Sequence, residues 1–251
     1  MDVTNATLLE RVDLTDAVAH FRVRADDGPP DFRPGQYMAL GLADGDRLVQ
    51  RPYSAASRPD MDGDVEFLIR RVQGGALTPR LWDARPGARM RVGRPRGLFT
   101  LQPDDPRTHL FVATGTGIAP FVSMLETLLE APRPPRSVVI HGVSHPGELG
   151  YRASLEGWAY GWPVSYEPTI SRPADPASQG WAGLTGRAEA VVDRVCDEHG
   201  LDPADSVAYL CGNPEMIATV GRILAARGFP AEAIKSEHYW PAGSPEVRTS
   251  A

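Results

Sequence analysis

The first hundred residues alternate short hydrophobic runs with Gly, Pro and Asp at nearly even spacing. Short strands spaced in this way, with turn signals between them, are typical of a β-barrel or a β-sandwich. Leu77, Leu81 and Trp82 recur at helical spacing, which predicts one short helix over 77–83. The predicted strands are 7–12, 18–24, 36–42, 48–56, 64–72 and 88–93.

After residue 108 the pattern changes to continuous apolar strands that alternate with helices. A strand is predicted over 109–113, and a helix with one apolar face follows over 119–130. Such alternation predicts a parallel sheet with right-handed crossovers. A later helix has a full set of end signals, with Asn213 as N-cap, Pro214 in its first turn and Gly228 at its exit. The further predicted strands are 137–143, 164–170 and 206–211.

These two patterns divide the chain into two domains and a tail. Residues 102–108 have the composition of a linker, so we expect one domain over 1–101 and a second over 108–240. Residues 173–183 are predicted to form a surface loop, and residues 241–251 a loose tail.

Composition narrows the functional classes. No apolar run approaches the roughly 20 residues that cross a bilayer, and residues 1–5 lack a signal-peptide pattern, so we expect a cytoplasmic protein without membrane contact. The net charge of −6 argues against nucleic acid as a partner. Cys196 and Cys211 are too few for an iron–sulfur cluster, so any electron-transfer role would require an organic cofactor. His141 and His145 have no third ligand in sight, and no metal site is predicted.

A glycine loop lies between the predicted strand and helix of the second domain. Gly115 and Gly117 stand where exposed backbone N–H groups and a helix N-terminus bind a nucleotide pyrophosphate. Pro120 replaces the third glycine of the dinucleotide fingerprint. Taken alone, the loop is weak support for nucleotide binding, because a strand–helix turn also contains glycine where the backbone must turn tightly.

A second constellation, Arg51-x-Tyr53-Ser54, closes a predicted strand of the first domain. Alternation along the strand puts Arg51 and Tyr53 on one side and Ser54 on the other. In isolation this is also the composition of an ordinary strand end. Downstream, the glycine turn 74–80 opens the short helix and places Thr78 for a phosphate contact. A second anion site within a β domain indicates a second nucleotide-like cofactor.

Both constellations belong to an ordered set of motifs that covers most of the chain. The motifs are Arg51-Pro52-Tyr53-Ser54, Gly75-Ala76-Leu77-Thr78, Gly97-Leu98-Phe99, Ala113-Thr114-Gly115-Thr116-Gly117-Ile118-Ala119-Pro120, Cys211-Gly212-Asn213-Pro214-Glu215-Met216 and Glu237-His238-Tyr239-Trp240. With this set the chain resembles bacterial ferredoxin–NADP reductases, in the broader ferredoxin–NADP reductase superfamily. The resemblance implies an α+β two-domain fold, in which an N-terminal antiparallel β-barrel binds FAD and a C-terminal Rossmann-like α/β domain binds NADP(H).

The resemblance also implies roles for residues around the flavin. Arg51 would pair with the FAD pyrophosphate, where a planar guanidinium suits phosphate geometry. Tyr53 would stack on the isoalloxazine, and Ser54 would hydrogen-bond near flavin N5, the atom that accepts hydride. Thr116 would lie where the two cofactors meet. The remaining implied flavin contacts are Pro52, Ile69, Arg70, Arg71, Gly75, Ala76, Leu77 and Thr78.

On the nicotinamide side, the resemblance places Cys211 beside nicotinamide C4 and Trp240 over the flavin face. In isolation, Cys211 is equally well interpreted as a small buried structural residue, and Cys196 is interpreted as a core residue. Relatives with this ending often stop at the tryptophan, whereas this chain continues to Ala251, which puts the stacking role of Trp240 in question. The other implied nucleotide contacts are Gly115, Thr116, Gly117, Gly212 and Met216.

Discrimination between NADPH and NADH depends on two arginines. Arg172 and Arg187 match positions that bind the 2′-phosphate in relatives, and Ser171 could add a hydroxyl. Ser144 occupies a position where relatives often carry arginine, and Glu148 could instead reach a bare ribose. We favour NADPH and keep NADH open.

These observations predict an FAD-dependent oxidoreductase, a monomer, that transfers hydride from NADPH to FAD and then single electrons to ferredoxin or flavodoxin, or runs in reverse. A basic stretch in the first domain could form the rim for such an acidic carrier, or a solvated face. Two alternatives are an NADH-linked reductase component serving an oxygenase or free flavin, and a non-catalytic flavin- or nucleotide-binding subunit. The basic stretch consists of Arg85, Arg89, Arg91, Arg94 and Arg96.

Overall fold

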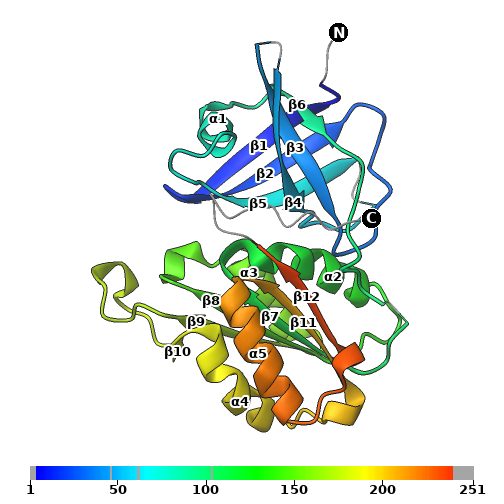
Figure 1. The fold of residues 1–251 in the computed structure, drawn as a ribbon, viewed down its shortest axis with the longest axis vertical. Coiled ribbons are helices and arrows are strands. Elements are labelled where there is room, and N and C mark those ends of the chain that lie inside the picture. Colours follow the sequence, from blue (N-terminus) through cyan, green and yellow to red (C-terminus); the bar gives the residue numbers. More distant parts are fainter. Residues whose placement is uncertain (1–3, 46, 61–62, 103, 240–251) are drawn as a thin grey trace.

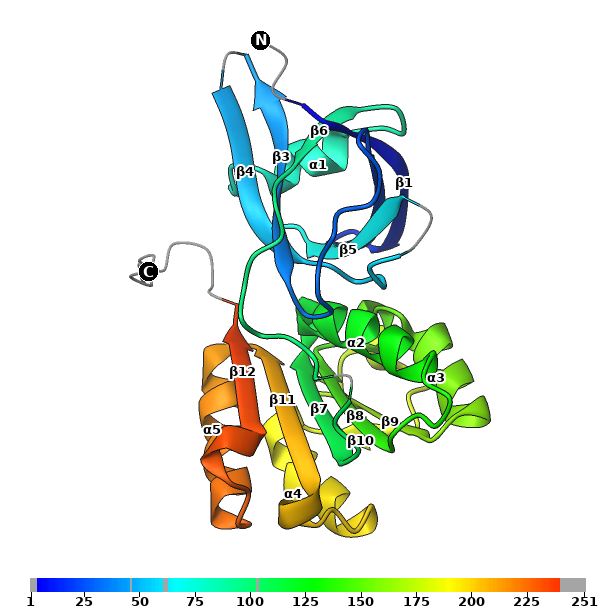
Figure 2. The same ribbon diagram turned by 90° about the vertical axis from the view of Figure 1, so that its right-hand side faces the viewer.

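The computed structural model describes residues 4–45, 47–60, 63–102 and 104–239, and it confirms the expected α+β architecture of a barrel followed by a parallel α/β unit (Figure 1). The N-terminal strands form one antiparallel six-stranded sheet in the order β4-β3-β6-β1-β2-β5, which curves into a barrel (Figure 2). These strands are β1 (Ala6–Thr15), β2 (Val18–Ala25), β3 (Tyr37–Asp44), β4 (Arg47–Ser54), β5 (Asp64–Arg70) and β6 (Arg89–Val92).

The barrel interior explains why the alternating pattern of the N-terminal half predicted its strands. Phe21 of β2 and Phe67 of β5 are directly paired in the ladder, and both are fully buried. The short helix α1 (Thr78–Asp83) buries Leu81 in the same core, as its spacing predicted. Burial of alternate residues also determines the strand register, because a slip by one residue would expose every core side chain.

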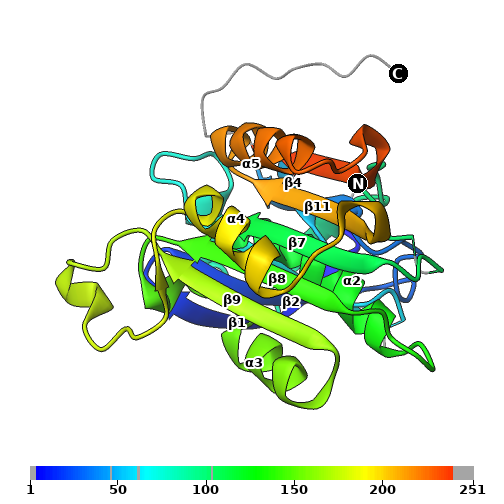
Figure 3. The same cartoon turned by 90° about the horizontal axis from the view of Figure 1, so that it is seen from below.

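The C-terminal half is a parallel six-stranded sheet in the order β10-β9-β8-β7-β11-β12. Helices α2 and α3 pack on one face and α4 and α5 on the other, so the sheet is covered on both sides (Figures 2 and 3). Its strands are β7 (Thr108–Thr114), β8 (Ser137–Val143), β9 (Val164–Ile170), β10 (Leu184–Thr185), β11 (Ser206–Gly212) and β12 (Ile234–His238). Its helices are α2 (Ala119–Leu129), α3 (Arg152–Gly161), α4 (Ala188–Glu198) and α5 (Pro214–Ala226).

The end signals of α5 act as predicted. The Asn213 side chain accepts hydrogen bonds from the N–H groups of Glu215 and Met216, which have no partner inside the helix. Gly228 follows the last turn with φ of +93°, a left-handed conformation that glycine adopts without strain. None of the helices in the described part of the chain has the length and apolar character needed to cross a bilayer.

Helix α3 and strand β12 are among the elements that the pattern of apolar positions did not predict. Helix α3 buries Leu155 alone among its residues and is otherwise polar, so its apolar face is narrow. Strand β12 reads Ile-Lys-Ser-Glu-His, without alternation of apolar and polar residues. It forms because β11 supplies a parallel ladder of backbone hydrogen bonds at the sheet edge.

Polar contacts join the barrel to the α/β domain. Arg70 at the end of β5 pairs with Glu148 at 3.0 Å. The Tyr151 hydroxyl donates to Glu66 of β5 at 3.0 Å, and its ring meets the edge of His20. Tyr151 has φ of +58°, the one positive φ outside glycine among the described residues. A bulky residue in this conformation is strained, so the contacts across the interface hold it there.

Candidate active site at the domain interface

Three hydroxyl and carboxyl groups meet where the barrel faces the α/β domain. Ser54, the last residue of β4, is buried and donates a hydrogen bond to Glu237 Oε2 at 3.2 Å. The Tyr239 hydroxyl donates to Ser54 Oγ at 2.6 Å. Glu237 lies on β12 and Tyr239 follows that strand directly. Ser54 is therefore held from both sides by residues about 180 positions away, with separations of 183 and 185.

Cys211 completes this cluster from the neighbouring strand. The parallel register pairs Cys211 with Glu237 and Gly212 with His238, and the Tyr239 N–H continues the ladder to the Gly212 carbonyl at 2.8 Å. Burial raises the pKa of the Cys211 thiol well above its usual value, although a hydrogen bond with Tyr239 acts in the opposite direction. The residue is consequently a neutral thiol with poor nucleophilicity.

The carboxyl group of Glu237 is the titratable group of the cluster nearest neutrality. Burial raises the pKa of Glu237 to about 7, while the Ser54 hydrogen bond lowers it slightly. Burial also raises the pKa of Tyr239 well above 10, so its hydroxyl remains a donor. A carboxyl group with a pKa close to neutral can hold or release a proton at working pH.

The glycine loop lies against this cluster. Residues Gly115–Ile118 form a 3-10 turn rather than an open loop, and α2 starts after it. Gly115 has φ of +54°. A Cβ on Gly117 would overlap the backbone carbonyl of Cys211, so glycine here permits close contact between the loop and the end of β11. Asn213 N–H donates to Thr114 Oγ1 at 2.8 Å across the same junction.

The predicted flavin contacts form an accessible surface on the barrel. Arg51 is exposed, and among the described residues its guanidinium donates one hydrogen bond, to the adjacent Gln50 carbonyl. Tyr53 is half-buried, and burial raises its pKa to about 12. An extended cation next to a partly exposed ring fits a dinucleotide that needs a phosphate partner and a stacking partner.

The glycine turn before α1 also fits a phosphate. Gly74 has φ of +69°, and Thr78 Oγ1 accepts from the Val72 N–H at 2.9 Å, which closes the turn. Thr78 is thus already used to shape the loop, whereas the N–H groups of Ala76 and Leu77 take part in none of the turn and loop hydrogen bonds of the described residues. Donors of this kind at the start of a helix suit an anion.

The other residues predicted to contact the flavin differ in how deeply they are buried. The side chains of Ile69 and Leu77 lie in the barrel core, so only their backbone can border a flavin. Pro52 and Arg71 are exposed. Gly75 has no room for a larger side chain, because an added Cβ would press on Val72 and Thr78.

The structure brings the predicted 2′-phosphate residues to one edge of the sheet. Strands β9 and β10 are parallel and pair Ile170 with Thr185, so Ser171 and Arg172 follow one strand where Gly186 and Arg187 follow the other. Arg172 makes no side-chain hydrogen bond or ion pair within the described ranges, and Arg187 makes a long contact of 3.9 Å with Glu189. Both guanidinium groups remain available to a ligand.

Ser144 and Glu148, which bear on the choice of nucleotide, contact each other. Glu148 Oε2 accepts the Ser144 N–H at 3.0 Å, and Oε1 pairs with Arg70 of the barrel. Both oxygens of the carboxylate are therefore engaged, which argues against its use for a bare ribose. Met216 is buried in the core beneath α5, so its side chain contributes packing.

Glu237 and Tyr239 are the residues whose role sequence reasoning missed. Both belong to a motif at the end of the chain, Glu237-His238-Tyr239, but a polar edge strand carries no burial signal that separates them from surface residues. Trp240 and residues 241–251 lie outside the described residues. No group of three potential metal ligands occurs within the described ranges.

Comparison with known proteins agrees with this arrangement. The sequence model of the oxidoreductase FAD-binding domain matches residues 5–101, and that of the oxidoreductase NAD-binding domain matches residues 111–222. Ferredoxin–NADP reductase B of Sorangium cellulosum (strain So ce56) is 35% identical over 221 residues, which cover 86% of this chain and 88% of that protein. The electron transfer component of anthranilate 1,2-dioxygenase from Acinetobacter baylyi (strain ATCC 33305 / BD413 / ADP1) is 32% identical, and the match covers 86% of this chain but 61% of that longer protein.

A solved structure extends the comparison to the fold. The ferredoxin NADP+ reductase of Neisseria gonorrhoeae with bound FAD and NADP superposes with a TM-score of 0.80 at 24% identity, over 94% of this chain and 98% of that one. Fold, domain matches and site together define a flavoprotein oxidoreductase with one FAD-binding and one nicotinamide-nucleotide-binding domain. The chain belongs to the ferredoxin–NADP reductase superfamily.

Proposed function

We propose that this protein takes hydride from NADPH and passes electrons one at a time to ferredoxin or flavodoxin, or runs the same reaction in reverse. The observation that carries the proposal is the hydrogen-bonded cluster of the buried Ser54 with the half-buried Glu237 and Tyr239, which lies between the two domains beside Cys211. FAD, when bound, supplies the exchange between two-electron and one-electron chemistry. The protein residues supply binding, orientation and protons.

Each residue of the cluster has a role that follows from its contacts. Ser54 is held in one orientation because it donates to Glu237 and accepts from Tyr239, which leaves one lone pair of its hydroxyl oxygen to accept a hydrogen bond from a flavin ring N–H. Glu237 holds a proton at its carboxyl group near neutral pH. Cys211 provides a small uncharged wall that excludes water from the nicotinamide side.

The choice of NADPH is supported by the two arginines at the ends of β9 and β10. Arg172 and Arg187 leave their guanidinium groups without a strong partner, and Arg187 directly precedes α4. Guanidinium groups and a helix N-terminus together favour a phosphate dianion over a ribose hydroxyl.

Anaerobic titration of the FAD-bound protein with NADPH and then with NADH tests this proposal. We expect NADPH to bleach the flavin absorbance at a concentration roughly tenfold or more below that of NADH, because the extra phosphate adds charge-assisted hydrogen bonds. Equal titration curves would contradict the NADPH assignment. A purified protein that neither contains nor takes up FAD would contradict the function as a whole.

The acceptor proposed is a small acidic carrier. In the barrel, Arg96 exchanges backbone hydrogen bonds with Tyr37, which pairs with Ser54 in the β3–β4 ladder, so the basic stretch reaches the cluster. Arg89 of that stretch is already bound to Asp26. We expect the KM for ferredoxin or flavodoxin to rise steeply with ionic strength, as electrostatic docking requires.

A second candidate function is that of the reductase partner of an oxygenase. It is supported by the 32% identity to the anthranilate 1,2-dioxygenase electron transfer component, although that protein is longer. Steady-state rates with ferredoxin, flavodoxin and free flavin as acceptors, each with NADPH and NADH, separate the two. A high rate with NADH and a preference for free flavin would favour the second candidate.

A further inference from the structure

A buried histidine contacts the backbone of the glycine loop. His141 lies in β8 with no exposed surface. Its Nε2 is 2.9 Å from the carbonyl oxygen of Gly115, and its Nδ1 is 3.3 Å from the hydroxyl of Tyr166 on β9. His141 therefore connects the glycine loop to the middle of the sheet.

The partners of His141 define the direction of both hydrogen bonds. A carbonyl oxygen only accepts, so Nε2 must carry the proton that it donates to Gly115. Burial lowers the pKa of His141 to about 4, against the opposing effects of the hydrogen bond to the Gly115 carbonyl and of the charge of Glu148, so the ring is neutral at physiological pH. Nδ1 is then an acceptor, and the Tyr166 hydroxyl donates to it. The pair has one consistent arrangement of protons.

Anchoring the Gly115 carbonyl also orients the next N–H group. The peptide unit is planar and trans, so the carbonyl of Gly115 and the N–H of Thr116 point in opposite directions. With the carbonyl turned toward His141, the Thr116 N–H is turned away from it. Thr116 lies in the first turn of the Gly115–Ile118 helix, where an N–H has no partner within the helix.

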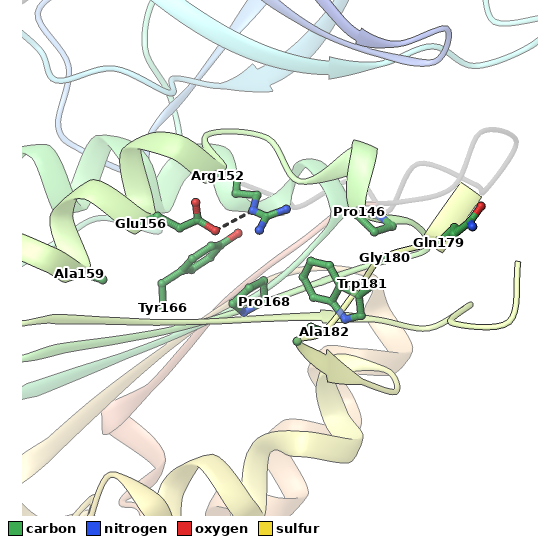
Figure 4. A pocket seen from close by; sticks show the side chains of 11 residues that line it. Pro146, Arg152, Glu156, Ala159, Tyr166, Pro168, Gln179, Gly180, Trp181 and Ala182 are labelled. Atoms are coloured by element: carbon green, nitrogen blue, oxygen red, sulfur yellow. Dashed lines mark hydrogen bonds and ion pairs between the residues drawn. The ribbon is translucent and has the colours of Figure 1, made fainter. Parts of the chain in front are cut away.

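Tyr166 also lines a cavity of about 530 Å³, together with Arg152 of α3, Pro168 of β9 and Trp181. Figure 4 shows the Tyr166 ring rising from β9 toward the Arg152–Glu156 ion pair. Because this side of the ring faces a cavity, removal of its hydroxyl leaves the packing of the sheet intact.

We propose that His141, oriented by Tyr166, is a positioning residue for the nicotinamide half of the bound nucleotide, because it holds the Gly115 peptide so that the Thr116 N–H faces the ligand. The proposal rests on the proposed nucleotide function of the glycine loop. It concerns a different part of the ligand from Arg172 and Arg187, which are placed for the 2′-phosphate. Substitution of His141 should therefore weaken binding of the whole coenzyme more than binding of its phosphate-bearing fragment.

The test compares His141→Phe, His141→Gln and Tyr166→Phe in the FAD-bound protein. Each variant is titrated with NADP+ and with 2′-AMP, followed by the change in flavin absorbance or by calorimetry. We expect His141→Phe to weaken NADP+ about tenfold and Tyr166→Phe about threefold, with 2′-AMP affinity unchanged within a factor of about two. His141→Gln keeps an N–H donor at the Nε2 distance, so it should recover most of the affinity.

Three outcomes would overturn the proposal. One is unchanged NADP+ affinity in His141→Phe; another is equal loss of NADP+ and 2′-AMP, which indicates general damage to the domain. The third is a Gln variant as weak as the Phe variant. Tyr166→Phe keeps the test decisive if His141→Phe fails to fold. If the wild-type protein binds 2′-AMP no better than adenosine, the NADPH assignment fails instead, and the same comparison is run with NAD+ against adenosine.

Discussion

The two ends of the proposed nucleotide site are built in opposite ways. At the reacting end, Ser54 is 3% exposed and bonded to both Glu237 and Tyr239. At the phosphate end, the Arg187 side chain is 69% exposed and its one ion pair within the described residues is long. Under the proposed function, the protein preorganises the reacting end, and the phosphate of the ligand would order the other end.

This difference reflects what each end must do. A hydroxyl that acts on a developing charge must be in place before the reaction, so it is bonded in advance and shielded from water. Arginines that recognise a phosphate can remain solvated, because the dianion supplies the attraction when it arrives. The first arrangement creates buried groups with altered pKa values, and the second creates exposed charges without stabilising partners.

The largest effect expected at the preorganised end concerns the pH dependence of stability. Burial raises the pKa of Glu237 from 4.5 to about 7, so between these values the folded protein binds more protons than the unfolded chain. The free energy of unfolding therefore falls as pH rises from about 4.5 to 7, by roughly 3 kcal/mol from this group. Glu237→Gln removes the titration, and its unfolding free energy, measured by urea denaturation at saturating FAD, should lose that slope.

An exposed carboxylate gives the matched control for this measurement. Glu198 forms an i,i+4 ion pair on the surface of α4. Glu198→Gln should leave the slope between pH 4.5 and 7 as in the wild-type protein. If the Glu237→Gln protein keeps the wild-type slope, the carboxyl group of Glu237 is not buried in the protonated state.

The next effect concerns the oriented hydroxyl. Ser54→Ala removes the group that Glu237 and Tyr239 hold, and the rate of flavin reduction by NADPH should fall about a hundredfold, roughly 2.7 kcal/mol, in stopped-flow absorbance. Ser57→Ala is the control, because Ser57 is also buried and accepts a hydrogen bond, from the Glu66 N–H, outside the cluster. A Ser54→Ala protein as fast as the Ser57→Ala protein would remove the cluster from the reaction.

The smallest effect is expected at the exposed end. Arg172→Ala and Arg187→Ala should each raise the KM for NADPH about tenfold, roughly 1.4 kcal/mol, and leave the KM for NADH nearly unchanged. Arg222→Ala on α5, whose exposed guanidinium bonds to Thr219, should change neither value. Equal losses for both coenzymes in the first two variants would show that these arginines do not recognise the phosphate.

The sequence predicted the structure correctly where interactions between neighbouring residues determine it. Alternating apolar residues predicted the strands of the barrel, and the cap at Asn213 and the glycine at Gly228 predicted the limits of α5. Each of these inferences needs the periodicity or end chemistry of one segment at a time. Arg172 and Arg187 were grouped by the family resemblance instead, and the parallel pairing of β9 with β10 brings them to one edge of the sheet.

Contacts between distant segments could not be predicted in the same way. The polar strand β12 has no apolar period, and it exists because β11 offers a ladder for it. Glu148 looked available to a ribose until the structure placed it against Ser144 and Arg70. The glycine at Gly117 was expected to admit a pyrophosphate, and in the structure it makes room for the Cys211 carbonyl.

The sequence by itself determined the two-domain order, the strands and helices with strong periodicity, and the motifs that mark the flavin and nucleotide surfaces. Only the tertiary structure decided which groups surround Ser54, that Glu237 is buried with a raised pKa, and that His141 supports the glycine loop. The physical reason is that periodicity and capping depend on neighbours along one chain segment. Burial and hydrogen-bond partners depend on distant segments that meet only in the folded structure, within one domain for His141 and between the two domains for Ser54 and Glu237.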